Sequence, residues 1–119
     1  MEKKRIAILN CLNANDVCAG ASCMKALEER RAAFSVYQDQ EVLLSAFARC
    51  SHCHVHLKND RGMQEKLERL VSEQVSTVHI GVCATQRNRG TQQVTRCPYM
   101  EENEQWLKEH GIEVIWGTH

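Results

Sequence analysis

The chain has 119 residues, of which 43% are hydrophobic and 25% charged, values typical of one globular domain with an ordinary core. Fifteen Lys and Arg residues balance fifteen Asp and Glu residues, so no net field favours binding to nucleic acid or to an acidic membrane surface. The early apolar run at 6–9 is too short for a signal-peptide core, and no later run approaches the ~18 residues of a membrane span. We therefore expect one cytoplasmic domain over residues 1–119.

The first half of the chain predicts two buried strands separated by a loop and a helix. In chain order these are a strand at 5–10, a loop at 12–21, a helix from Ser22 to about Ala32, and a strand at 41–48. Both strand segments are short and largely apolar, as expected for strands buried on two faces. Ser22 is a favourable residue for the cap that begins a helix.

The clearest helical pattern lies in the middle of the chain. Apolar residues recur there at positions i, i+4, i+7 and i+8 between charged residues, which is typical of an amphipathic helix. These residues are Met63, Leu67, Leu70 and Val71. A third strand is predicted at 77–82, and Gly81 within it indicates the close approach of another backbone.

The last third of the chain predicts a loop, a helix and a strand. The polar stretch 84–96 is long for a compact domain and predicts a lid or a binding loop. Pro98 suits the first turn of a helix that runs to His110, with Gly111 as its stop. A final strand is predicted at 112–116.

Strands that alternate with helices at this spacing predict βαβ units and a parallel sheet. Right-handed crossovers then place helices on both faces of the sheet. The fold class we expect is α/β, a small three-layer fold of Rossmann or flavodoxin-like type with a mostly parallel sheet of about four strands.

The unusual feature of the composition is its seven cysteines. They are Cys11, Cys18, Cys23, Cys50, Cys53, Cys83 and Cys97. In a reducing compartment such a set indicates metal binding or redox chemistry more often than a disulfide framework. The odd number also fits poorly with complete pairing.

Most of these cysteines lie where a predicted strand ends or a predicted helix begins. Cys11, Cys50 and Cys83 each follow a strand, and His119 closes the chain after the last one. Residues that follow parallel strands gather at one edge of the sheet, where such folds place their ligands. Thiolate and imidazole are preferred ligands of Zn²⁺, and thiolates also hold Fe–S clusters. We therefore predict a site for zinc, or alternatively an Fe–S cluster, formed from Cys11, Cys18, Cys23, Cys50, Cys53, Cys83, Cys97 and His119.

Other interpretations of the cysteines remain open at this point. Cys50 and Cys53 form a C-x-x-C pair that could act as a redox dithiol, with Cys50 attacking and Cys53 resolving, or Cys18 and Cys23 could act in this way. A polar loop rather than a helix is predicted after Cys53, which weakens this interpretation. Several cysteines could instead pack as small apolar side chains, or the chain could store metal or dock a partner through residues 84–96. The sequence leaves open whether the chain is an enzyme, because no carboxylate pair or nucleophile–base pair stands out.

Histidines and arginines near the predicted edge are further candidates. His52, His54 and His56 alternate, so an extended segment would place all three on one side, as metal ligands or as solvated side chains. His79 lies within a strand and is expected to be a hydrogen-bonded core or edge histidine. The arginines of the predicted loop that could bind an anion by charge-assisted hydrogen bonds are Arg87, Arg89 and Arg96.

The order of these features resembles the CGGC-domain family of small cysteine-rich proteins. The matching parts are Cys11 after the first strand, Cys18-Ala19-Gly20, Cys23, Ala33-Phe34, the central C-x-x-C, Cys83, Cys97-Pro98 and the closing Gly117-Thr118-His119. The resemblance covers nearly the whole chain and implies a metal-binding protein, with zinc as the metal. Ser51-His52 stand where the family has two glycines, and Tyr99 stands where the family often has a histidine.

Overall fold

A computed structural model of the chain describes residues 3–119, so Met1 and Glu2 of the predicted domain lie outside the described part. The strands of its main sheet are β1 (Lys4–Asn10), β2 (Val42–Arg49), β3 (Thr77–Ile80) and β6 (Glu113–Trp116). The α-helices are α1 (Ala21–Glu29), α2 (Arg61–Ser72) and α3 (Pro98–Glu109). Short 3₁₀ helices are η1 (Leu12–Asp16), η2 (Ala32–Tyr37), η3 (Leu57–Asn59) and η4 (Val82–Ala84).

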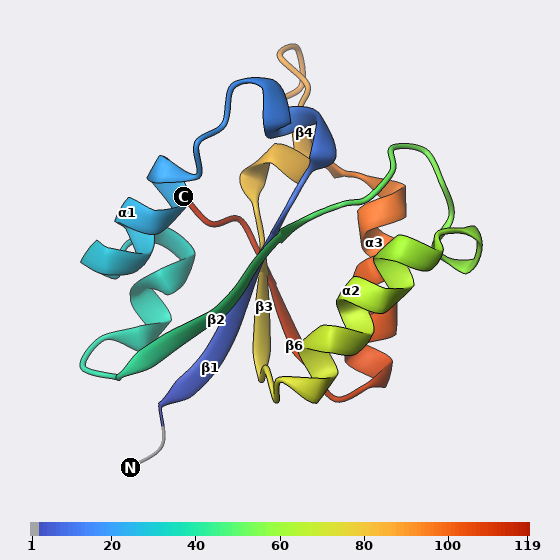
Figure 1. Cartoon of the computed structure of the whole chain (residues 1–119). Helices are drawn as coiled ribbons and strands as arrows, with labels where there is room; N and C mark the ends of the chain where they lie inside the picture. Colours follow the sequence, from blue (N-terminus) through green and yellow to red (C-terminus); the bar gives the residue numbers. More distant parts are fainter. Residues whose placement is uncertain (1–2) are drawn as a thin grey trace.

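The main sheet is fully parallel, with strand order β2-β1-β3-β6 (Figure 1). At its centre Ile8 of β1 stands level with Phe47 of β2 and with His79 of β3. All four strands therefore end at the same edge, and the α/β prediction is confirmed. This edge is the one at which the predicted metal ligands were expected to meet.

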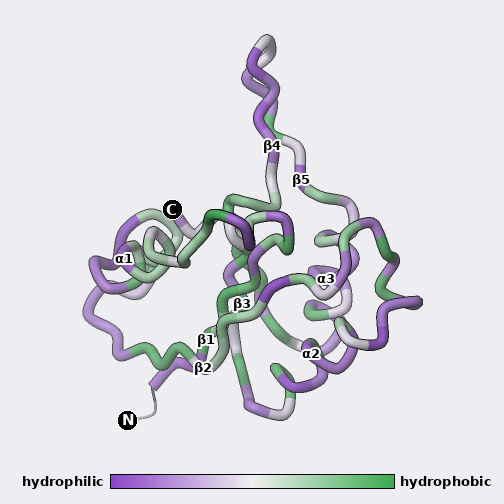
Figure 2. The backbone as a smooth tube through the Cα atoms, turned by 45° about the horizontal axis from the view of Figure 1, so that its top comes forward, coloured by the Kyte–Doolittle hydropathy of each residue, from purple (hydrophilic) through white to green (hydrophobic). Residues whose placement is uncertain are grey.

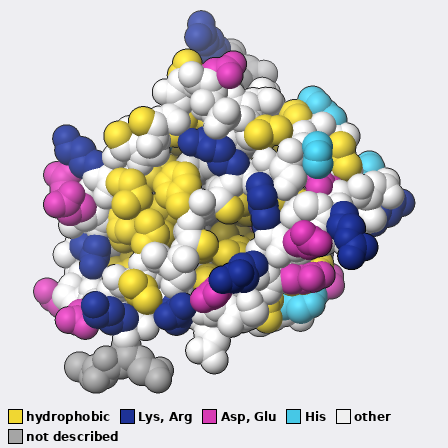
Figure 3. Space-filling model, viewed as in Figure 1, with side chains coloured by type: hydrophobic (Ala, Val, Ile, Leu, Met, Phe, Trp, Pro, Cys, Tyr) yellow, Lys and Arg dark blue, Asp and Glu magenta, His cyan; other side chains and the backbone are white. Residues whose placement is uncertain are grey.

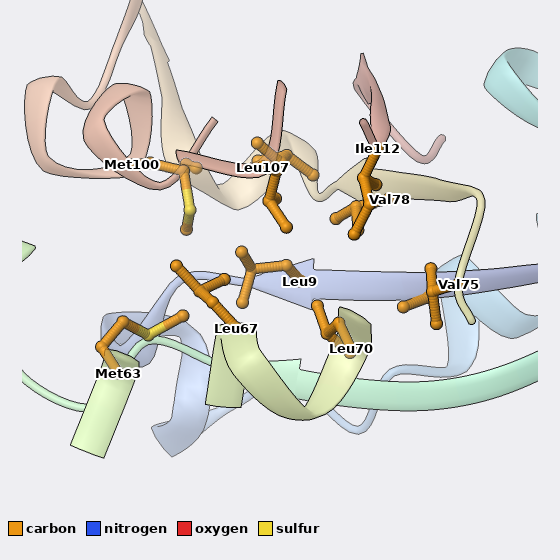
Figure 4. Packing of buried hydrophobic residues seen from close by; sticks show 12 residues of the cluster. Leu9, Met63, Leu67, Leu70, Val75, Val78, Met100, Leu107 and Ile112 are labelled. Carbon is orange, nitrogen blue, oxygen red and sulfur yellow. The ribbon is translucent and has the colours of Figure 1, made fainter. Parts of the chain in front are cut away.

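Helices cover both faces of the sheet (Figure 1). Ala7 and Leu9 of β1 pack with α2 and α3, whereas Ile6 and Ile8 pack on the opposite side with α1 and η2. Figure 4 shows Leu9 between Leu67 of α2 and Leu107 of α3. Because β1 is buried on both faces, its sequence is a continuous apolar run rather than an alternating one.

The two longest helices begin with recognisable local signals. In α2 the Asp60 side chain accepts a hydrogen bond from the backbone N–H of Met63 at 3.0 Å, a cap the sequence analysis did not single out. In α3 Pro98 occupies the first turn, and Gly111 follows the helix with a φ of 81°, a left-handed conformation that favours glycine. Each helix has 12 residues, and none within residues 3–119 is long and apolar enough to cross a membrane.

The polar stretch 84–96 differs from the predicted loop. It forms an antiparallel hairpin of β4 (Thr85–Arg87) and β5 (Val94–Arg96), which projects from the body of the molecule (Figures 1 and 2). Its strands are not buried against the sheet, so they lack the apolar alternation by which strands are predicted. Residues 12–21 also contain more structure than a loop, because η1 lies within them.

His79 is fully buried, as expected for a core histidine. Its Nε2 lies 2.7 Å from the hydroxyl oxygen of Tyr37, which confirms the predicted hydrogen bond. Burial disfavours the charged imidazolium and lowers the pKa of His79 to about 4. The side chain therefore belongs to the core under α1 and not to the edge where the cysteines lie.

Candidate metal centre

Hydrogen bonds donated by backbone N–H groups tie four cysteine-bearing segments together at the carboxyl edge of the sheet. The N–H of Cys50 donates to the carbonyl of Asn10 at 3.0 Å, and the N–H of Cys97 donates to the carbonyl of Ala84 at 2.9 Å. The N–H of Cys11 donates directly to Sγ of Cys83 at 3.1 Å. The ends of β1, β2 and β3 and the start of α3 are thus fixed relative to one another.

These segments enclose a cavity of about 450 Å³, called here the thiol cavity. The cysteines that line it are Cys11, Cys53, Cys83 and Cys97, together with the imidazole of His54. Cys50 lines a smaller space of about 30 Å³ that shares Cys11, Cys53 and Cys97 with the larger one. Side chains from four separate parts of the chain therefore face a single cavity.

Two of the thiols are held in their protonated form by their surroundings. The pKa of Cys50 is raised to about 12, mainly by burial and in smaller part by the neighbouring Cys11 and Cys97, against an opposing effect of Lys66. Burial also raises the pKa of Cys83, which the hydrogen bond from Cys11 N–H partly offsets. Both thiols would need a nearby cation to become thiolates at neutral pH.

The loop after β2 carries Cys53 to the mouth of the cavity. His52 Nδ1 lies 3.1 Å from Oδ1 of Asp60, the cap of α2, and this contact anchors the loop. Cys53 is exposed, with its sulfur 3.2 Å from the Asn13 amide and 3.3 Å from Nδ1 of His54. Figure 3 shows imidazole side chains gathered on the side of the molecule where this loop lies.

The three loop histidines do not lie in an extended segment, which was the condition for placing them on one side. Residues 51–54 form a bend and a turn, and His54 has a φ of 63°, in the left-handed region that non-glycine residues adopt at a cost. His54 lines the thiol cavity, whereas Nδ1 of His56 lies 2.6 Å from a carboxylate oxygen of Glu102. The three side chains thus have different partners.

The chemistry of the donors fits a thiolate-binding metal, but the donors are not assembled. Four thiols and one imidazole line the cavity, which is the donor set that Zn²⁺ prefers. Among residues 3–119, no three Cys, His, Asp or Glu side chains stand close enough together to hold an ion in this arrangement. Metal binding would therefore need these side chains to come closer together.

The model of the CGGC domain matches residues 5–119 of the chain. The chain belongs to the CGGC-domain family. No curated protein and no solved structure shows a significant match to it. Membership of the CGGC family is consistent with a cysteine-rich metal-binding protein, and the metal itself is not identified by that membership.

The departures from the family pattern lie beside the cavity. Tyr99, which stands where CGGC proteins often have a histidine, lines the thiol cavity. Its ring lies edge-on to His54, with 5.5 Å between ring centroids, and at 5.1 Å from His56. Imidazoles from the loop after β2 therefore flank the position where the family histidine would stand.

The structure does not bring every predicted ligand to the cavity. In the described part of the chain, Cys18, Cys23 and His119 line neither of the two spaces. Cys23 is buried on α1, with Sγ 2.9 Å from Oγ1 of Thr118. The sulfur of Cys18 accepts the N–H of Gly20 at 3.3 Å, and His119 is exposed.

Asn10 is a buried polar residue at the same edge of the sheet that sequence reasoning missed. It is fully buried beside Cys23, and its Oδ1 has no hydrogen-bond partner among residues 3–119. A Cβ at Gly81 would meet Oδ1 of Asn10 at 2.0 Å, so the close approach predicted at Gly81 comes from this side chain and not from a backbone. The sequence signal that could have identified it is the position of a polar residue at the end of an apolar strand.

Proposed function

We propose that the protein binds a metal ion, zinc in preference to an Fe–S cluster, through thiolates of the thiol cavity. The observation that carries the proposal is the convergence of Cys11, Cys53, Cys83 and Cys97 on one cavity. Four thiolates are the number that a tetrahedral structural zinc site requires. The reducing cytoplasm, where free cysteines persist, is the compartment that suits such a site.

The residues around these cysteines have separable roles in the proposed site. The N–H of Cys11 donates to Sγ of Cys83 and would stabilise that sulfur as a thiolate. The Asn13 amide contacts Cys53 in the same way. A bound Zn²⁺ would supply the positive charge that makes deprotonation of the thiols favourable. Cys50, half-buried next to Met100 and Asn103, would pack behind the site.

Metal analysis of natively purified protein, prepared without oxygen, tests the proposal. We expect close to one zinc ion per chain and a colourless solution. If the protein contains iron in place of zinc and the solution is brown, the cavity binds an Fe–S cluster. Protein with neither metal near stoichiometric amounts, and no uptake of added Zn²⁺ in a competition with a chromogenic chelator, would overturn it.

The environment of Cys53 favours a second candidate, thiol–disulfide exchange. In this reaction the Cys53 thiolate attacks a disulfide of a substrate, one substrate sulfur leaves as a thiolate, and Cys50 then attacks the mixed disulfide. The substrate gains two electrons and the protein gains a Cys50–Cys53 disulfide. Cys53 is exposed, whereas Cys50 is half-buried and has a raised pKa, so Cys53 suits the first attack and Cys50 the resolving step. This reverses the predicted order of the two.

Alkylation measures which of the two thiols is reactive. With limiting iodoacetamide at pH 8, Cys53 should be modified well before Cys50, because a pKa of about 12 leaves Cys50 almost entirely protonated. Peptide mass spectrometry reads the order, and unfolded protein, in which both thiols react alike, is the control. Equal rates in the folded protein would show that Cys50 is not shielded as the structure indicates.

A further inference from the structure

The thiol cavity is larger than a metal ion needs. Its volume of about 450 Å³ lies within the range of about 300–1,000 Å³ that is typical of small-molecule pockets. A water molecule, by comparison, takes about 30 Å³ of liquid. The cavity has room for a small organic or inorganic ligand beside its thiols.

The hairpin forms one wall of this cavity and gives it a positive charge. Gln86, Thr95 and Arg96 from β4 and β5 line the cavity beside the cysteines. Residues 84–97 contain three arginines and no Asp or Glu. The Asn13 amide also lines the cavity, where it donates to the sulfur of Cys53. The polar lining contributed by these segments is rich in donors, which suits an anionic ligand.

Arg96 is held in place by its neighbours. Its guanidinium lies over the ring of Trp116, 4.5 Å from the ring centroid, and the indole N–H of Trp116 donates to Glu104 at 3.0 Å. Stacking occupies the face of the guanidinium and leaves its N–H edge available. Glu104 is the nearby carboxylate, and it is also paired with Lys108 at 3.2 Å. Among residues 3–119, the N–H groups of the Arg96 guanidinium, called here the Arg96 fork, form no hydrogen bond or ion pair.

The first turn of α3 adds to the positive electrostatic potential at the cavity. Pro98 and Tyr99 line the cavity, so the positive end of this 12-residue helix lies at its wall. The N-terminal end of a helix favours an anion because its first N–H groups lack partners within the helix. Glu101 in that first turn is exposed and carries an opposing charge.

We propose that the thiol cavity also binds a small oxyanion ligand, a carboxylate or a phosphate, and that Arg96 meets its charge. This site goes beyond metal binding and does not need a metal to be present. The Arg96 fork would bind the two oxygens of such a group together, as guanidinium groups do with carboxylate and phosphate. The remaining volume would accommodate the rest of the ligand next to the thiols.

Trp116 provides a direct readout of this site. In metal-free Trp106→Phe protein, Trp116 is the remaining tryptophan, and a ligand that engages Arg96 changes its fluorescence. Inorganic phosphate and acetate are the probes, and calorimetry gives an independent affinity. We expect saturable binding of at least one probe, and the tighter of the two identifies the oxyanion class.

Substitution at Arg96 then separates the proposed site from general charge effects. Arg96→Gln should weaken binding at least about tenfold, as expected for loss of a charge-assisted pair. Arg87→Gln, on the same hairpin but outside the lining, should bind as the parent does. Arg96→Lys, which keeps the charge without the fork, should lie between them.

Three results would overturn the proposal: neither probe saturates, Arg87→Gln weakens binding as much as Arg96→Gln, or a bound probe fails to slow alkylation of Cys97. Circular dichroism of each variant verifies that it is folded. Zinc uptake is measured separately on the same samples, so that failure of the oxyanion proposal can be told apart from failure of the metal proposal. Loss of zinc uptake with phosphate binding intact would count against the metal alone.

Discussion

Cys97→Ser is expected to lower the affinity for zinc by at least about 100-fold, whereas Cys18→Ser should leave it unchanged. Loss of a group that only supports a metal ligand typically costs 10–100-fold, and loss of a ligand itself should cost no less. The two cysteines are closely matched, since both are half-buried and both precede a helix. Only Cys97 lines the thiol cavity in the described part of the chain.

Chelator competition measures these affinities, and thermal unfolding gives a second readout. Zinc at about 1,000 times its dissociation constant stabilises a protein by about 4 kcal/mol, so EDTA should lower the Tm of the parent and of Cys18→Ser by roughly 10–20 °C. For Cys97→Ser the same zinc concentration is at most about 10 times the dissociation constant and stabilises by no more than about 1.4 kcal/mol, so its Tm should fall on chelation by at most about a third as much. An equal loss of zinc affinity in both variants, or no loss of zinc affinity in Cys97→Ser, would contradict the assignment of ligands to the cavity.

The convergence of cysteines could be anticipated because it follows from chain direction alone. Parallel strands end at one edge, so residues directly after β1, β2 and β3 meet there whatever their side chains do. Cys11, Cys50 and Cys83 illustrate this rule. The amphipathic pattern of α2 was equally informative, because burial of its apolar stripe decides its orientation.

Side-chain direction could not be anticipated in the same way. Cys23 lies near the same edge, yet it belongs to the core under α1, since the rotation of that helix places it on the inner face. The turn at Cys53 depends on the contact between His52 and Asp60, a pair eight residues apart that no local pattern marks. The β4–β5 hairpin leaves no apolar signal, because its strands do not bury one face.

Gly81→Ala is expected to destabilise the fold by about 2–3 kcal/mol, a large effect for one methyl group. The added Cβ would lie 2.0 Å from Oδ1 of Asn10 and 3.1 Å from Sγ of Cys83. Gly81 has a φ of −63°, which any residue adopts, so the cost comes from the clash and not from the backbone. Asn10 is fully buried and held in register between β2 and β3, so it cannot move aside freely.

Urea unfolding measures this cost, with Gly90→Ala in the hairpin as the matched control. The nearest atom to a Cβ at Gly90 is Oδ1 of Asn88 at 3.4 Å, so that change should stay within about 0.5 kcal/mol. In an Asn10→Ala background, where the carboxamide is gone, Gly81→Ala should cost much less than in the parent. If the cost is undiminished there, Asn10 is not what requires glycine at position 81. A reduced cost would show that the Asn10 carboxamide, which lies beside Cys23, is what requires glycine at position 81.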